Sequence, residues 1–203
     1  YLPRGNDRSV VSFLRDHPDS YARAFSLIEG RLAQLYLFAY QSYLWNETLA
    51  GYLRRWVPSD RLFEVTYAPG RLVFADPPGE DLLAELRGLD VALPHPKAEY
   101  PDGVLADSLR EVLAAERIRL EDLRVRRVRG LRFRGGRRAA LVTPDGLELE
   151  GDQPDDRYPG KRKLRVRFGM PPGSYATLVI KVLGRDLLPG SRRSRRGGRR
   201  SAK

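Results

Sequence analysis

The stretch Ala39-Tyr40-Gln41-Ser42-Tyr43-Leu44-Trp45-Asn46 lies within the longest helical pattern of the chain. Apolar side chains recur around it at the spacing of one helix face, at Tyr21, Phe25, Ile28, Leu32, Leu35, Ala39 and Tyr43. Gly30 favours a break into two helices, and Pro58 ends the pattern because proline has no backbone N–H to donate. Since Tyr43 and Leu44 fall on the apolar face, we expect both in the core. The polar groups of Gln41, Ser42 and Asn46 either satisfy neighbouring segments or serve a functional site.

The residues before Leu120 are predicted to be mostly helical, with one hairpin. Helical patterns cover Val10–Asp16, Glu80–Arg87, and a segment that opens with Ser108 and Glu111 as a capping box and runs through Glu116. Strand patterns at Phe63–Tyr67 and Arg71–Ala75 flank Pro69 and Gly70, a pair that suits a tight turn. The proline-rich run Leu89–Gly103 is interpreted as a loop.

After Leu120 the chain is predicted to be mostly β. Apolar residues alternate with arginine from Val125 to Phe133, and further strand patterns cover Ala139–Thr143, Leu147–Leu149, Leu164–Phe168 and Ala176–Leu183. The polar stretch Glu150–Lys163, rich in Asp, Pro and Gly, is interpreted as a linker or domain crossing.

Composition excludes several kinds of site. The chain has no cysteine, which rules out disulfides, cysteine nucleophiles and thiolate metal sites. The only histidines, His17 and His95, have no further ligands at metal spacing, so no metal site is predicted. Asp152, Asp155 and Asp156 are interpreted as solvated loop charges. No apolar run reaches the roughly 18 to 20 residues that cross a bilayer, and we expect no membrane association.

The charge distribution favours a polyanionic partner. Gly190–Lys203 contains seven basic and no acidic residues, and without them the formal net charge falls from +11 to +4. Such a tail either binds RNA through counterion release or is a disordered, solubilising extension. In Gly135-Gly136-Arg137-Arg138, the glycines permit close backbone approach and the arginines suit phosphate, although a hairpin turn with exposed arginines explains the pattern equally well.

A second informative stretch is Phe168-Gly169-Met170-Pro171-Pro172-Gly173-Ser174-Tyr175-Ala176-Thr177. Pro171, Pro172 and Gly173 predict a bend that Ser174 caps and that leads into a buried strand. This stretch resembles the Phe-x-Leu-Pro-x-Gly-Ser-Tyr-Ala-Thr segment of TruD-type tRNA pseudouridine synthases, with Met170 at the leucine position. Ala39–Asn46 resembles that family's Ala-x-Gln-Ser-x-Leu-Phe-Asn helix, and Gly130–Leu141 its Gly-x-Arg segment.

The resemblance implies an α+β fold with an inserted α/β domain of the TRUD type and the last strands of a pseudouridine synthase catalytic domain. Residues 1–150 would be most of the inserted domain, residues 151–189 the C-terminal strands of the catalytic domain, and residues 190–203 a disordered basic tail. It also implies a cytoplasmic enzyme, monomeric when full length, that acts on tRNA, uses no cofactor and binds neither DNA nor membranes.

In this family a uridine is turned out of its stack, its base is detached from the sugar, rotated and rejoined through carbon five, and one aspartate carries the chemistry. The resemblance assigns RNA or uridine-pocket contacts to Gly173, Ser174, Tyr175, Ala176, Thr177, Arg137 and Arg138.

The sequence departs from the family at the catalytic segment. The Gly-x-Lys-Asp-like segment that holds the family's aspartate, and the Asn-x-Phe-Gly segment after it, have no counterpart among these residues, so no catalytic residue is assigned. The sequence begins with Tyr1 and its only methionine is Met170, and we therefore expect a fragment that is inactive alone. The alternatives are a non-catalytic RNA-binding module related to the inserted domain and a basic accessory protein that binds RNA nonspecifically.

Overall fold

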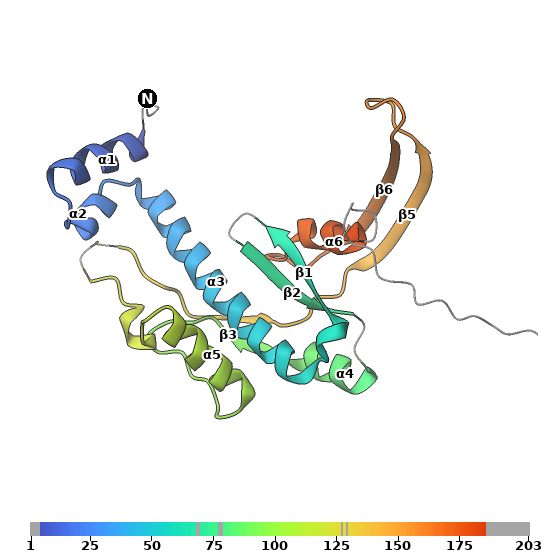
Figure 1. Cartoon of the computed structure of the whole chain (residues 1–203), viewed down its shortest axis with the longest axis horizontal. Coiled ribbons are helices and arrows are strands. Elements are labelled where there is room, and N and C mark those ends of the chain that lie inside the picture. The colour runs from blue at the N-terminus through green and yellow to red at the C-terminus, as the bar shows by residue number, and fades with distance from the viewer. Residues whose placement is uncertain (1–4, 68–69, 77–78, 127, 129, 186–203) are drawn as a thin grey trace, which may run out of the picture. The chain divides into compact units, whose positions relative to one another are not determined.

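The computed structural model describes residues 5–67, 70–76, 79–126, 128 and 130–185. The chain divides into two units, Tyr1–Ala140 and Leu141–Lys203. The described part of the first unit is a mixture of helices and short strands, and that of the second is a hairpin with one helix (Figure 1). The mixed α+β class expected from the sequence is confirmed.

The first unit is built on a helix of 27 residues, α3. Its helices are α1 (Asn6–Asp16), α2 (Tyr21–Phe25), α3 (Gly30–Trp56), α4 (Glu80–Gly88) and α5 (Val104–Ala115), with short 3₁₀ turns at Ser59–Arg61 and Leu120–Asp122. Its strands form two antiparallel pairs, β1 (Leu62–Tyr67) with β2 (Gly70–Ala75) and β3 (Asp90–Ala92) with β4 (Arg137–Ala139). The predicted hairpin, the helix closed by Gly88 and the break before Gly30 are confirmed.

The ends of α3 follow from its sequence. The Glu29 carboxylate accepts hydrogen bonds at 3.1 Å from the backbone N–H groups of Arg31 and Leu32, which have no acceptor inside the helix. At the other end Val57 is extended, the conformation favoured before a proline. Gly30 is therefore the first residue of the long helix and not a weak point inside it.

The core of the first unit lies where α3 and α5 pack side by side (Figure 1). Leu44 is fully buried in a cluster with Leu109, Leu113 and Leu123. Tyr43 packs against this cluster and is half-buried. The expectation that Leu44 belongs to the core is confirmed, and Tyr43 lies at the core's edge.

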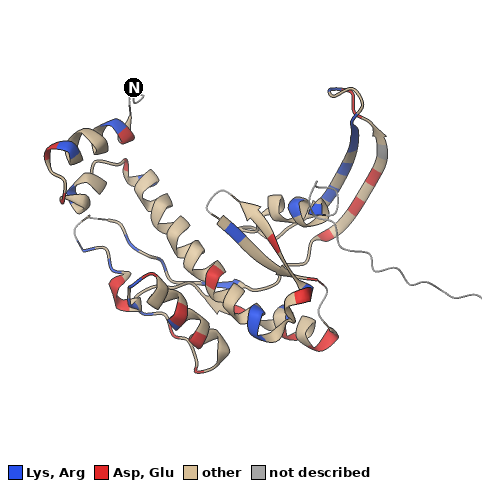
Figure 2. Cartoon of the chain, viewed as in Figure 1, with Lys and Arg blue, Asp and Glu red and all other residues tan. Residues whose placement is uncertain are grey.

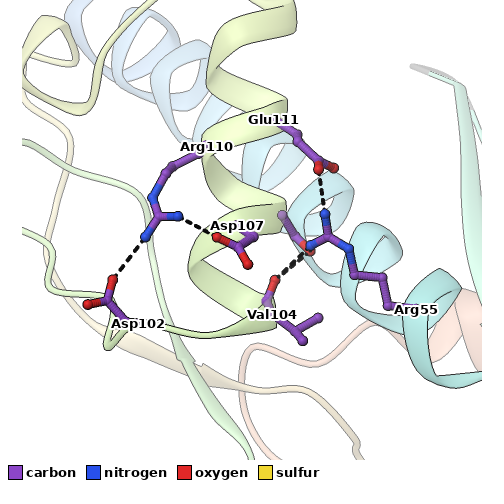
Figure 3. Close-up of polar contacts among 7 residues, drawn as sticks. Arg55, Asp102, Val104, Asp107, Arg110 and Glu111 are labelled. Atoms are coloured by element: carbon purple, nitrogen blue, oxygen red, sulfur yellow. Dashed lines mark hydrogen bonds and ion pairs between the residues drawn. The ribbon is translucent and has the colours of Figure 1, made fainter.

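Polar contacts also join the two helices. Arg55 of α3 donates to Val104 O at 3.1 Å and to Ser108 Oγ at 3.0 Å, and it forms an ion pair with Glu111 (Figure 3). Ser108 Oγ itself donates to Val104 O at 2.8 Å. The prediction that Ser108 caps a helix is wrong: α5 begins at Val104, and Ser108 lies in its second turn, where it faces Gly51. The two helices approach closely at this glycine, because a Cβ at Gly51 would lie 3.0 Å from Ser108 Cβ.

Hydrogen bonds to Glu116 connect α3 with the end of α5. The Glu116 carboxylate accepts hydrogen bonds from Tyr40 Oη at 2.8 Å and Tyr43 Oη at 3.1 Å. Burial, together with the neighbouring carboxylate, raises the pKa of both phenols, so both remain protonated donors.

Three further predictions about the first unit are wrong. Leu89–Gly103 is not only a loop, because it contains β3. No strand is found among the described members of residues 125–133. Of the strand expected at Ala139–Thr143, only Ala139 lies in a strand, as the last residue of β4. The alternation from Val125 to Phe133 instead reflects burial: the described apolar residues of this range are partly buried, with Phe133 packed against the core cluster, and the described arginines are exposed.

The second unit contains β5 (Asp145–Pro154), β6 (Arg162–Gly169) and α6 (Ala176–Leu183). The strands expected at Leu147–Leu149 and Leu164–Phe168 are confirmed as an antiparallel hairpin, in which Glu148 lies opposite Arg167 and Glu150 opposite Arg165 (Figure 2). The linker expected at Glu150–Lys163 is wrong, since most of it belongs to the two strands and their turn.

The strand expected at Ala176–Leu183 is also wrong, because this segment is α6. A run of eight mostly apolar residues has no period that separates a buried strand from a helix. In the structure it is a helix, whose last turn is extended by a hydrogen bond from the Gly184 N–H to Ile180 O at 2.8 Å.

The two units are divided at Ala140/Leu141, whereas the sequence placed a domain boundary after residue 150, inside what is now β5. The assignment of the segments to an inserted and a catalytic domain stays a prediction, and the tail 190–203 lies outside the described residues. Among the described helices, none is both long and apolar enough to cross a membrane.

Candidate nucleic-acid interface

The most basic part of the first unit is residues 123–138, which we call the arginine segment and of which the structure describes all but residues 127 and 129. Leu123 is buried and Phe133 packs against the core cluster, so both anchor the segment to the helices. The arginines that lie between and beyond these anchors are exposed, namely Arg124, Arg126, Arg132, Arg134 and Arg137. Figure 2 shows basic residues following one another along this segment. The result is a row of cations on a backbone that is held in place.

Two glutamines of α3 hold that backbone. Gln34 Nε2 donates to Arg132 O at 2.9 Å, and the Gln34 Oε1 atom accepts from the Arg132 N–H at 3.4 Å. Gln41, which is 2% exposed, donates from Nε2 to Arg134 O and to Pro94 O, both at 2.8 Å. Residues seven apart lie on the same side of a helix. The two glutamines therefore fix the segment along one face of α3.

Two aromatic rings of the same helix lie beneath arginine side chains. The guanidinium carbon of Arg134 lies 5.3 Å from the centre of the Phe38 ring, and that of Arg138 lies 5.3 Å from the Trp45 ring. Trp45 is itself held by a hydrogen bond from Nε1 to Val91 O at 3.2 Å. Both distances are within the range of cation–π attraction.

The structure explains the paired glycines by local packing. Gly136 has a φ of 147°, and its carbonyl accepts from the Leu93 N–H at 2.9 Å as the chain enters β4. A Cβ at Gly135 would lie 3.3 Å from Nε2 of His95. β4 pairs with the distant β3, so these residues do not form the tight hairpin turn that was the alternative interpretation. Arg137, in β4, donates to Asp90 O.

The other predicted site residues lie in the second unit, before and at the start of α6. Gly173 has a φ of 85°, and the Ser174 N–H donates to Pro171 O at 3.2 Å, so the predicted bend is present. The N-cap of α6 is Tyr175 and not Ser174; Tyr175 makes no side-chain capping bond, and its side chain is 56% exposed. Ala176 and Thr177 are exposed in the first turn. The predicted site residues therefore fall in both units, Arg137 and Arg138 in the first and Gly173–Thr177 in the second.

The acidic loop residues have structural contacts. Asp155 Oδ1 accepts from the backbone N–H groups of Arg157 at 2.8 Å and Tyr158 at 3.1 Å, which closes the β5–β6 turn. Asp156 pairs with Lys163 at 2.7 Å, and the hydrogen bond from Lys163 lowers the pKa of the Asp156 carboxyl. Within the described part of the chain no group of three or more candidate ligands could hold a metal ion.

Sequence reasoning missed the roles of Gln34, Phe38 and Arg134. The sequence contains one signal for them. Two glutamines, Gln34 and Gln41, and two aromatic residues, Phe38 and Trp45, are each spaced seven residues apart within one helical pattern.

The family model described as tRNA pseudouridine synthase D (TruD) matches residues 2–183. The chain belongs to the TruD family. It is 31% identical over 186 residues to "Probable tRNA pseudouridine synthase D 2" of Methanocaldococcus jannaschii, with 89% of this chain and 43% of the relative covered. It is 30% identical over 186 residues to tRNA pseudouridine synthase D of Aquifex aeolicus, with 90% and 45% covered.

A solved TruD structure from Methanosarcina mazei resembles this TruD-family chain with a TM-score of 0.58 at 23% identity, over 86% of this chain and 43% of that one. This likeness supports the fold. The chain spans less than half the length of the curated relatives it matches.

Proposed function

We propose that the chain acts in a tRNA pseudouridine synthase, which isomerises a uridine of tRNA to pseudouridine. The observation that carries this proposal is the TruD family match across residues 2–183. The isomerisation detaches the base and rejoins it through another carbon, so it needs neither an oxidant nor a reductant. We therefore propose that no cofactor takes part. A cytoplasmic location and a monomeric full-length enzyme belong to the same proposal and rest on the family.

Within this function the two groups of candidate residues have different roles. Arg137 and Arg138, in and beside a row of exposed arginines, would contact RNA phosphates. The bend and helix start at Gly173–Thr177 would form one wall of the pocket for the flipped uridine. The exposed ring of Tyr175 gives that wall a surface against which a base can stack.

The proposal is tested in cells that lack the gene. Pseudouridine in total tRNA is mapped by carbodiimide modification and reverse transcription in the parent, the deletion strain and the strain with the gene restored. Loss of the signal at one uridine, and its return with the gene, is the expected result. An unchanged map of pseudouridine would contradict the proposal that the protein is an enzyme. If the 203-residue chain still bound tRNA, the chain would instead be a non-catalytic RNA-binding module.

We expect residues 1–203 by themselves to form no pseudouridine in an unmodified tRNA transcript. The chemistry needs a carboxylate held against the sugar or base, and positioning alone does not supply it. Asp155 and Asp156 are engaged in the β5–β6 turn, and Asp7 lies in the first turn of α1. Pseudouridine above a no-protein control would contradict this prediction and direct the search to the chain's own aspartates.

Tyr175→Ala is expected to lower turnover of the active enzyme roughly tenfold while changing tRNA affinity less than twofold. A pocket wall orients the flipped base and does not bind phosphates, so its loss acts mainly on kcat. The matched control is Tyr158→Ala, which removes a tyrosine of similar exposure, 65%, from the β5–β6 turn. Equal turnover of both variants would show that Tyr175 is not part of the pocket.

A further inference from the structure

We propose that Arg134 and Arg138, here called the arginine pair, bind two different phosphates of an RNA backbone, with Phe38 and Trp45 as their supports. This inference rests on the proposed function and adds a residue, Arg134, and a geometry that neither the family match nor the sequence assigns. The two guanidinium groups lie over the rings of Phe38 and Trp45 at 5.3 Å.

Among the described residues, Arg134 and Arg138 contact aromatic rings of α3, whereas several other arginines are held by carboxylates. Arg110 and Arg119, for example, are paired with aspartates at 2.9 Å and 3.1 Å. In the described part of the chain, no carboxylate lies within ion-pair distance of Arg134 or Arg138. An aromatic ring attracts a guanidinium without neutralising its charge and without accepting its in-plane N–H groups. Those N–H groups therefore remain available for a bidentate bond to a phosphate.

Both arginines are also fixed before any ligand binds. The carbonyl of Arg134 accepts a hydrogen bond from the buried Gln41 at 2.8 Å. Arg138 lies in β4 opposite Val91, and the carbonyl of Val91 accepts from the Trp45 indole at 3.2 Å. The Trp45 ring, which supports Arg138, is thus hydrogen-bonded to β3, and β3 is the strand that pairs with β4 and so positions Arg138. Such preorganisation reduces the entropy lost when the side chains bind a ligand.

The spacing of the supports indicates two phosphates. Phe38 and Trp45 are seven residues apart on α3, about 10 Å along the helix axis at 1.5 Å per residue. The two guanidinium groups are thereby directed to different phosphates of one strand, or to phosphates of the two strands of a stem.

The test measures binding of a fluorescein-labelled, unmodified tRNA transcript to the 203-residue chain by anisotropy, from low to moderate salt. Arg134→Gln and Arg138→Gln should each weaken binding roughly tenfold, as expected for loss of a charge-assisted hydrogen bond. Each should also reduce the slope of log K against log salt by about 0.7 to 0.9, the value for one phosphate contact. The double variant should lose about twice that slope.

The matched control is Arg54→Gln on the same helix. Arg54 is exposed and lies nine residues, or two and a half turns, beyond Trp45, so it is on the opposite side of α3. Arg54→Gln changes the net charge by the same amount as each variant of the arginine pair. Its affinity for tRNA and its slope of log K against log salt should nevertheless stay near those of the parent. A loss equal to that of the arginine pair would show that only total charge matters and would overturn the proposal.

Lysine variants separate the effect of the positive charge on binding from the effect of the planar guanidinium group. Arg134→Lys and Arg138→Lys should keep the salt slope but lose several-fold in affinity, because lysine retains the charge without the planar fork. Thermal midpoints measured on every variant show that it is folded, and the lysine variants carry the test if a glutamine variant does not fold.

The outcomes distinguish this inference from the function on which it rests. If the parent binds tRNA and the double variant keeps its affinity within twofold and its slope unchanged, the arginine pair does not bind phosphate and the proposed function is unaffected. If the parent shows no salt-dependent binding to tRNA, both this inference and the proposed tRNA substrate are overturned.

Discussion

Leu44→Ala is expected to lower the free energy of unfolding of the first unit by about 2 to 5 kcal/mol, the range for removing a fully buried leucine side chain. Leu44 is 0% exposed and packs against Leu109, Leu113 and Leu123. These partners come from α5 and from the start of the arginine segment, so the cavity would open where three segments meet. Partial collapse would be opposed by the ion pair and hydrogen bonds of Arg55 with α5.

Tryptophan fluorescence during urea unfolding measures this change, because both tryptophans, Trp45 and Trp56, lie in α3. The control is Leu35→Ala, the same substitution on the same helix at a position that is 59% exposed, and it should cost well under 1 kcal/mol. Similar midpoints for the two variants would contradict the position of Leu44 in the core.

Gln41→Ala is expected to destabilise the first unit by about 1 to 3 kcal/mol, through a different mechanism: the fully buried Pro94 carbonyl loses its donor. The side-chain amide donates to both Pro94 O and Arg134 O from a position that is 2% exposed. Its removal leaves two carbonyl groups without their donor, at about 1 to 3 kcal/mol for each one that stays buried and unsatisfied. It also releases the arginine segment from the loop that follows β3.

The matched control is Gln34→Ala, one heptad earlier. Gln34 makes the same kind of bond to Arg132 O at 2.9 Å, but it is only half-buried, and water can replace its amide. We expect its cost to stay below about 1 kcal/mol in the same urea experiment. If Gln34→Ala were as damaging as Gln41→Ala, burial would not be the reason for the effect.

These two variants bear on the meaning of the Ala39–Asn46 stretch. In it, Leu44 packs in the core, Gln41 holds two backbone segments and Trp45 supports Arg138. The contacts of these three residues therefore give the stretch a structural role: they form the core and hold the segment that carries the proposed RNA-binding arginines.

Local patterns in the sequence were sufficient for several elements. The helix face that contains Leu44, the β1–β2 hairpin, the helix closed by Gly88 and the bend at Gly173 each depend on residues that are close in the chain. The resemblance of three stretches also led to the TruD family, which the match over residues 2–183 bears out. Periodicity, turn chemistry and motif order are properties of the chain alone, so they can be read without a structure.

The tertiary structure decided what local patterns leave open. Alternation of apolar residues and arginine from Val125 to Phe133 has the period of a strand, but Phe133 packs against the core cluster and the Arg132 carbonyl accepts from Gln34 of α3. The run Ala176–Leu183 has no period that distinguishes a strand from a helix, and it folds as α6. Arg134 acquires its support from Phe38, 96 residues earlier in the sequence. Such contacts depend on which distant segments meet, and that is set by the packing of the whole unit and not by the residues on either side.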